Sequence, residues 1–213
     1  MKNTALLILL NISTLLLASC KDEAAQNYTS QGRLYLRSIM YISTGKVDLT
    51  WYYLGDDGWF VKNPKNGVNP VDINAEKQNN ADNTGTYKIT GNNIEIKWYT
   101  GDVNILSLKY KDDDIAEMDI GGIMMRQTGL PKGFTLNAVY QGINNGATYT
   151  FESGGAFSSK TFENGNWLSK KGNYTISGNN LILRNNDNST TLCLIAVFGD
   201  GAIVINNSYY SPK

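Results

Sequence analysis

Hydrophobic and polar residues alternate through most of the chain after about residue 30, with short Gly- and Asn-rich breaks between the alternating runs. Tyr87 and Ile89 alternate with polar neighbours up to a Gly-Asn-Asn sequence at 91–93. Ile94 and Ile96 continue the alternation beyond it. Because successive side chains of a strand point to opposite faces, this period of two predicts strands with one buried face. Glycine and asparagine accept the positive φ of tight turns, so the pattern predicts a β-hairpin here.

The same pattern occurs twice along the chain. Residues 85–96 and 172–183 share the order Gly-x-Tyr-x-Ile-x-Gly-Asn-Asn. A segment at 130–133 that contains Pro and Gly separates the two copies, as expected of a linker. An internal repeat indicates that one structural unit is used more than once. The sequence therefore predicts an all-β protein with two tandem antiparallel β-meander units, at 32–129 and 133–213, each a small barrel or sandwich.

One short helical turn is predicted near residues 70–77 of the first unit. Asn69 can cap the N-terminus of this turn, and Pro70 suits the first helical position because its fixed φ is already helical. The second unit has no corresponding segment, which is part of the reason why it is shorter.

The order of an aromatic strand, an acidic or Gly-rich turn and the repeated Gly-x-Tyr-x-Ile motif resembles the lipocalin-like β-meander units of secreted Bacteroidota lipoproteins. The resemblance covers both units, 32–129 and 133–213. It implies a meander fold and is compatible with ligand binding, but it names no ligand. The Gly-x-Trp element of lipocalins is not evident near the first strand, which argues against a single ligand-holding barrel.

Comparison of the two copies identifies a shared apolar face. When residues 52–60 are aligned with 149–157, Tyr52, Leu54 and Phe60 fall on aromatic residues of the second unit. These positions are the predicted core face of the first unit. Because side chains alternate along a strand, the residues between these positions point to the opposite face.

This opposite face is aromatic in the first unit alone, because the matching positions of the second unit carry Thr, Ala or Asn. Its members are Trp51, Tyr53, Trp59 and Tyr99. Aromatic planes with amides nearby bind sugar rings and flat apolar molecules. We therefore predict that these four residues bind a carbohydrate or a small apolar ligand. The alternative is that the face packs against the second unit or beneath the helical turn.

The first 20 residues have the features of an export signal. A positive start at Met1 and Lys2 precedes an apolar run at 5–17, which is shorter than the roughly 20 residues that span a bilayer. The run ends in Leu-Ala-Ser-Cys at 17–20, which resembles the bacterial lipobox. The resemblance implies that residues 1–19 are a signal peptide that is removed and that Cys20 carries the lipid. An ordinary signal peptide with an incidental cysteine is the alternative.

The residues after Cys20 bear on the location of the protein. Lys21, Asp22 and Glu23 resemble the surface-export signal of Bacteroidota lipoproteins. The resemblance implies an outer-membrane protein anchored by its lipid and displayed at the cell surface, with a periplasm-facing orientation as the alternative. Residues 20–31 are predicted to be the lipidated cysteine and a short polar tether.

Composition excludes several classes of function. The 213 residues include 19 basic and 19 acidic side chains and no histidine. Balanced charge lacks the basic patch of a nucleic-acid-binding protein, and the absence of histidine excludes His-based catalysis and the common zinc sites. We expect no cofactor or metal apart from the covalent lipid at Cys20. Cys193 lies in an apolar run and is expected to be a buried core thiol.

Three classes of function remain. The first is a non-catalytic, lipid-anchored cell-envelope protein that binds a ligand. The second is a hydrolase that uses two carboxylates on an envelope or extracellular polymer, for which Asp57, Asp72, Glu95 and Glu163 are available without any pair being indicated. The third is a purely structural envelope lipoprotein. The adjacent acids at 112–114 suit a solvated turn better than a calcium loop.

Overall fold

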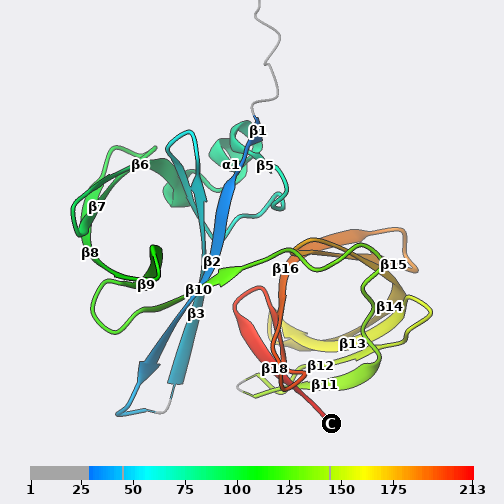
Figure 1. Cartoon of the computed structure of the whole chain (residues 1–213). Helices are drawn as coiled ribbons and strands as arrows, with labels where there is room; N and C mark the ends of the chain where they lie inside the picture. The colour runs from blue at the N-terminus through cyan, green and yellow to red at the C-terminus, as the bar shows by residue number, and fades with distance from the viewer. Residues whose placement is uncertain (1–28, 45, 144) are drawn as a thin grey trace, which may run out of the picture.

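The protein forms two closed barrels of eight antiparallel strands that lie side by side (Figure 1). The computed structural model describes residues 29–44, 46–143 and 145–213. The predicted signal peptide, Cys20 and the export signal at 21–23 lie outside these residues. The prediction of an all-β chain with two tandem meander units is confirmed, and each unit is a barrel.

The first barrel follows the chain as an up-and-down meander with one insertion. Its strands are β2 (Gly32–Tyr41), β3 (Lys46–Gly55), β4 (Trp59–Lys62), β6 (Thr84–Thr90), β7 (Asn93–Trp98), β8 (Val103–Lys111), β9 (Asp114–Met118) and β10 (Ile123–Gln127). β10 pairs with both β2 and β9, which closes the barrel. Tyr52, Leu54 and Phe60 belong to its buried core with Ile94 and Ile96, as the repeat alignment predicts.

The second barrel is an uninterrupted meander. Its strands are β11 (Ala138–Gly142), β12 (Thr148–Phe151), β13 (Ala156–Glu163), β14 (Asn166–Ser177), β15 (Asn180–Asn185), β16 (Thr190–Val197), β17 (Ile203–Ile205) and β18 (Ser208–Pro212). β18 pairs with β11 and closes the barrel. The ring of Phe151 contacts those of Tyr149 and Tyr174 with centroid distances of 5.8 and 4.9 Å, so aromatic side chains occupy the interior. Cys193 is buried in this core.

The two predicted turns occupy equivalent places in the barrels. The β6–β7 turn contains Gly91 with φ 57°, and the β14–β15 turn contains Gly178 with φ 58°. This left-handed conformation is costly for residues with a Cβ atom. A Cβ at Gly178 would also lie 2.2 Å from the side-chain nitrogen of Asn69 in the first unit. Glycine at 178 therefore permits both the turn and a close contact between the units.

An insertion between β4 and β6 carries the helical turn. It contains β5 (Val71–Asp72), α1 (Ile73–Asn79) and the 3-10 turn η1 (Ala81–Asn83). The helix begins later than predicted, because Val71 and Asp72 are extended and pair with β1 (Thr29–Ser30). Asp72, rather than Asn69, is the N-cap, and its carboxylate accepts a hydrogen bond from the Ala75 amide at 2.9 Å.

The pairing of β1 also corrects the predicted extent of the tether. Thr29 and Ser30 lie within the segment assigned to a polar tether, yet they form a strand against β5. Ser30 is buried and its hydroxyl donates to Asp57 at 2.7 Å. The described part of the chain is therefore fixed to the first barrel two residues before β2 begins.

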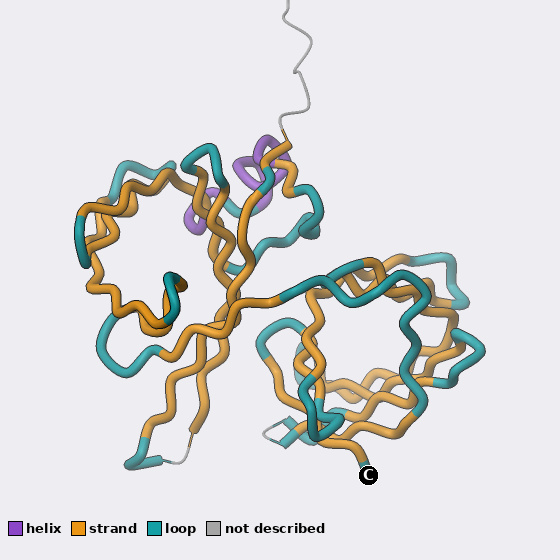
Figure 2. The backbone as a smooth tube through the Cα atoms, in the orientation of Figure 1, coloured by secondary structure: helices purple, strands orange, loops and turns teal. Residues whose placement is uncertain are grey.

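A third core joins the two barrels along a seam. It is formed by the outer faces of β2–β4, by the insertion and by the outer faces of β16 and β17. Figure 2 traces the backbone of the two barrels and of the helical insertion beside the first. Its buried members are Leu34, Leu36, Leu49, Trp51, Tyr53, Val61, Val68, Val71, Ile73, Leu194, Ala196 and Val204. Because this cluster contains residues of both units, burial of its apolar side chains stabilises the contact between the two barrels.

Candidate functional site

Two of the predicted ligand-binding residues lie inside the seam core. Trp51 is fully buried, and its indole nitrogen donates a hydrogen bond to the main-chain oxygen of Asn206 in the second barrel. Tyr53 is also buried, and its hydroxyl donates to Ser30 at 3.0 Å. Both side chains point away from the interior of the first barrel, as predicted. The second unit and the insertion cover them, so the expectation that these two rings form an open ligand surface is corrected.

The other two predicted residues lie beside the helix. Trp59 is half-buried and packs against the edge of the seam core. Tyr99 lies in the turn after β7 and is 61% exposed. The Lys77 ammonium of α1 lies 4.1 Å from the centre of the Trp59 ring and 5.8 Å from that of Tyr99. The lysine thus brings these two rings together by cation–π contacts, while Trp51 and Tyr53 belong to a different, buried environment.

A polar cleft opens at one side of the seam, with Trp51 in its wall. The cleft has a volume of about 370 Å³ and draws on the insertion and on β16 and the β17–β18 turn. Its lining residues are Trp51, Asn63, Pro64, Lys65, Asn80, Asn83, Leu192, Leu194, Asn206 and Asn207. Each amide side chain can both donate and accept hydrogen bonds. Asn80 and Asn207 also bond within the chain, so the cleft offers a ligand the remaining amide groups beside the half-buried Leu192.

A buried carboxylate shapes the insertion wall of this cleft. One oxygen of Glu76 accepts hydrogen bonds from the Lys65 and Asn66 amides at 2.8 and 2.7 Å, and the other accepts from the Asn80 side chain at 2.9 Å. The Asn80 side chain also donates to the main-chain oxygens of Lys62 and Asn63, both at 3.1 Å. Since a buried charge needs several partners to be stable, this network fixes the loop before α1. The cleft wall is consequently ordered by its own chain.

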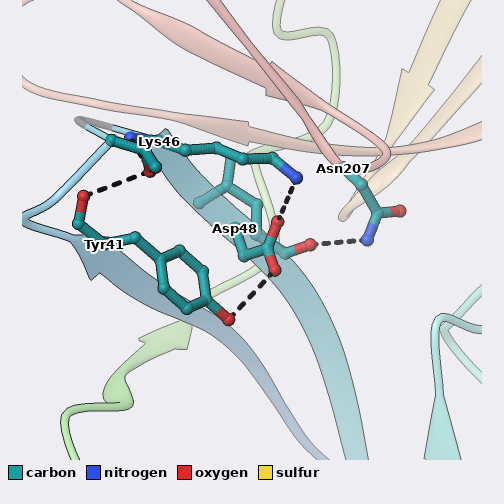
Figure 3. Close-up of polar contacts among 6 residues, drawn as sticks. Tyr41, Lys46, Asp48 and Asn207 are labelled. Atoms are coloured by element: carbon teal, nitrogen blue, oxygen red, sulfur yellow. Dashed lines mark hydrogen bonds and ion pairs between the residues drawn. The ribbon is translucent and has the colours of Figure 1, made fainter.

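The opposite wall comes from the β17–β18 turn. The Asn207 side chain donates to the main-chain oxygen of Leu49 at 2.6 Å, the contact drawn from Asn207 in Figure 3. It also donates to the side-chain oxygen of Asn63 at 3.0 Å. Asn206 has φ 51°, a conformation that asparagine tolerates better than most residues, and its side-chain oxygen accepts from the Leu194 amide at 2.9 Å. The Asn207 contacts bridge the two units beside the cleft.

A second hollow at the seam is apolar. It has a volume of about 310 Å³ and is shared between the β2–β3 hairpin, β10 and the second barrel. Its lining residues are Ser38, Val47, Leu49, Met125, Ile143, Phe198 and Tyr209. Ile143 is 62% exposed at its margin. The hairpin that forms one wall ends in polar contacts of Asp48 with Tyr41 and Lys46 (Figure 3).

Two carboxylates meet in a more open hollow of the first barrel. Asp82 and Asp102 line a space of about 570 Å³ together with Trp98 and Asn104. Both carboxylates are exposed to solvent. A glycosidase needs one acid in an environment that keeps its proton, which burial among apolar groups supplies. The four acids named from the sequence as available to a hydrolase do not line this hollow.

Buried tyrosines form the polar part of the barrel interiors. The Tyr35 hydroxyl donates to Asp114, which also lies 3.8 Å from the Arg126 guanidinium. Burial, followed by this hydrogen bond to a carboxylate, raises the pKa of Tyr35 to about 12. In the second barrel, burial raises the pKa of Tyr149 well above its ordinary value. These groups remain neutral across the physiological range and act as packed hydrogen-bonding side chains.

The asparagines of the polar cleft were not identified from the sequence. Nothing in the sequence distinguishes these asparagines from the others, because Asn is abundant in turns throughout the chain. Asn63 and Asn206 do share a positive φ, and each accepts a hydrogen bond from a neighbouring strand residue, with Trp51 and Leu194 as the donors. The cleft depends on the meeting of the insertion with β16–β18, which no local pattern specifies.

Comparisons with protein-family models, with curated proteins and with solved structures found no match. Among residues 29–44, 46–143 and 145–213, no helix has the length and apolar character needed to cross a membrane. The same residues contain no group of three acidic or cysteine side chains placed to hold a metal ion.

Proposed function

We propose that the protein is a non-catalytic, lipid-anchored cell-envelope protein that binds a glycan in the polar cleft between its barrels. The observation that carries this proposal is the lining of the cleft, in which five asparagines adjoin the half-buried Leu192. Amides match the donor and acceptor pattern of sugar hydroxyls, and apolar side chains match the faces of sugar rings. The filled barrel interiors support an external site, because packed side chains occupy the space inside each barrel.

The glycan proposal is tested by array binding with the purified protein in mild detergent. Asn83→Ala changes a half-buried amide of the cleft, and Asn166→Ala changes an exposed amide at the β13–β14 turn as a control. Loss of one hydrogen bond, about 0.5–1.5 kcal/mol, corresponds to roughly two- to twelvefold weaker binding. We expect this loss for Asn83→Ala alone. Equal affinity for both variants, or no glycan bound by either, contradicts the proposal.

A small apolar ligand is the second candidate, and the apolar hollow between the β2–β3 hairpin and the second barrel favours it. Binding of a fluorescent apolar probe should fall in Ile143→Gln, because Ile143 lies at the margin of this hollow. Ile120→Gln is the matched control, since Ile120 is 89% exposed in the β9–β10 turn. Probe binding that is equal in the two variants contradicts this candidate.

The lipid anchor rests on the lipobox resemblance at 17–20. Several apolar chains on one residue anchor a protein stably, and Cys20→Ala removes the residue that would carry them. This variant should therefore be released from the membrane fraction and should not incorporate labelled palmitate. Labelling that persists in Cys20→Ala contradicts the anchor.

Surface display rests on residues 21–23. Protease added to intact cells should cleave the native protein and spare the Asp22→Ala, Glu23→Ala variant. Equal cleavage of both forms would show that these acids do not direct export.

A further inference from the structure

The outer face of β12–β14 in the second barrel is a regular grid of hydroxyl and ammonium groups. Thr150, Ser158 and Lys171 are neighbours across the three strands. Thr148, Lys160 and Ser169 form the adjoining row. The surface between them is hollowed to a volume of about 310 Å³. Each row therefore places one positive charge beside two hydroxyl groups.

Most of the basic residues of the second barrel lie on these strands and on the neighbouring strand β15. Four of the five basic residues between 133 and 213 lie on β13–β15: Lys160, Lys170, Lys171 and Arg184. Lys170 pairs with Glu163 at 3.9 Å. Within the described chain, no carboxylate lies at ion-pair distance from Lys160 or Lys171. Two exposed ammonium groups thus remain available to an anion.

An exposed aromatic pair continues the same face. Phe162 and Trp167 are cross-strand neighbours with ring centroids 5.3 Å apart, and they are 54% and 48% exposed. Phe162 and Lys160 point to the same side of β13, because they are two residues apart. The Lys160 ammonium lies 5.2 Å from the centre of the Trp167 ring. Ring faces, hydroxyls and positive charges therefore lie on one continuous surface.

We propose that this face binds an acidic polysaccharide, a sugar chain that carries sulfate, phosphate or carboxylate groups. Lys160 and Lys171 bind the anionic groups, the Ser and Thr hydroxyls bond to sugar hydroxyls, and Trp167 contacts a ring face. This site lies on the outer face opposite the second-barrel core and shares no residue with the lining of the polar cleft. It is therefore independent of the proposed function.

A sugar chain fits this face better than an anionic membrane surface. The grid and the aromatic pair extend along the strands of β13 and β14, which suits an extended polymer. The hydroxyl-bearing members of the grid, which outnumber its two lysines, offer directed hydrogen bonds, whereas a membrane surface attracts mainly through charge. The Trp167 ring adds a contact area for a flat sugar face.

The test measures binding of a sulfated dextran oligosaccharide by calorimetry, with unmodified dextran of the same length as the uncharged probe. We expect the purified protein to bind the sulfated probe alone. Lys160→Gln with Lys171→Gln should weaken this binding at least tenfold. Lys88→Gln with Lys97→Gln is the matched control, since both lysines are exposed on strands of the first barrel and the change in charge is the same. The control should change the affinity less than twofold.

A third variant separates ring contact from charge. Trp167→Ala should weaken binding threefold or more while the salt dependence stays that of the native protein, because no charge is removed. Equal losses in the two lysine pairs would show a general charge effect and overturn the proposal. Failure to bind the sulfated probe would also overturn it. If the protein instead bound phosphatidylglycerol vesicles and this binding required Lys160 and Lys171, the face would be a membrane-binding surface.

Discussion

At the scale of single residues, Trp51 is a side chain of the first barrel that bonds directly to the second. It is fully buried in the seam core and bonds to the main chain of Asn206. Trp51→Ala should lower the free energy of unfolding by about 3–5 kcal/mol, as large aromatic core truncations do. Tyr99→Ala is the control, and a change within about 0.5 kcal/mol is expected because that ring is exposed. Urea melts of the two variants check this, and similar losses would contradict the assignment of Trp51 to packing.

The buried tyrosines predict the stability of the protein at alkaline pH. Burial raises the pKa of Tyr35 and of Tyr53 to about 12 in the folded state, against about 10 in an unfolded chain. The folded state therefore retains protons that the unfolded state loses, and stability falls as pH rises from about 10 towards 12. Urea midpoints should be level near pH 8–9 and fall above about pH 10.

Tyr53→Phe provides the check on this pH dependence. It removes one titrating group while keeping the ring in the seam, so the decline of the urea midpoint above about pH 10 should be shallower than in the native protein. Identical declines in the two proteins would show that Tyr53 does not contribute.

At the scale of elements, the insertion between β4 and β6 is held by Glu76 rather than by its short helix. The Glu76 carboxylate accepts from two main-chain amides and from the Asn80 side chain. Glu76→Ala should lower the free energy of unfolding by roughly 1–3 kcal/mol, because buried donors lose their acceptor. Glu95→Ala, at an exposed carboxylate of β7, should leave stability nearly unchanged. Thermal melts that rank the two variants in the opposite order would refute this role.

At the scale of the whole molecule, the seam core makes each barrel depend on the other. Leu194, Ala196 and Val204 of the second barrel pack with Trp51 and Leu36 of the first. We expect one cooperative unfolding transition in calorimetry, with equal calorimetric and van't Hoff enthalpies. Leu194→Asp should split this transition, because it places an unpaired charge in the seam.

Val139→Asp is the control for the seam variant. Val139 is 37% exposed on β11 and is not a member of the seam core. A single transition should persist in this variant. Two transitions in the native protein would show that the barrels unfold independently.

The alignment of the two copies, together with the period of two along a strand, was sufficient to predict the core face of the first unit. A period of two is a local property of a strand, and the match with residues 149–157 selected the face of Tyr52, Leu54 and Phe60 as the core without knowledge of the tertiary structure. The Gly-Asn turns and the buried position of Cys193 followed from equally local arguments. The helix start was predicted wrongly, because the pairing of Val71 and Asp72 with β1 competed with the local capping signal.

The sequence by itself thus determined that the chain has two β units and which side of the strands around 52–60 faces the core, while the tertiary structure showed that each unit closes into a barrel. The tertiary structure alone decided what covers the outer faces. Trp51 and Lys171 both lie on outer faces, yet Trp51 is buried beneath the second barrel and Lys171 is exposed. The difference depends on which surface of one unit meets the other, and that contact joins residues more than a hundred positions apart, such as Leu49 and Asn207. No periodicity within a strand records such a pairing.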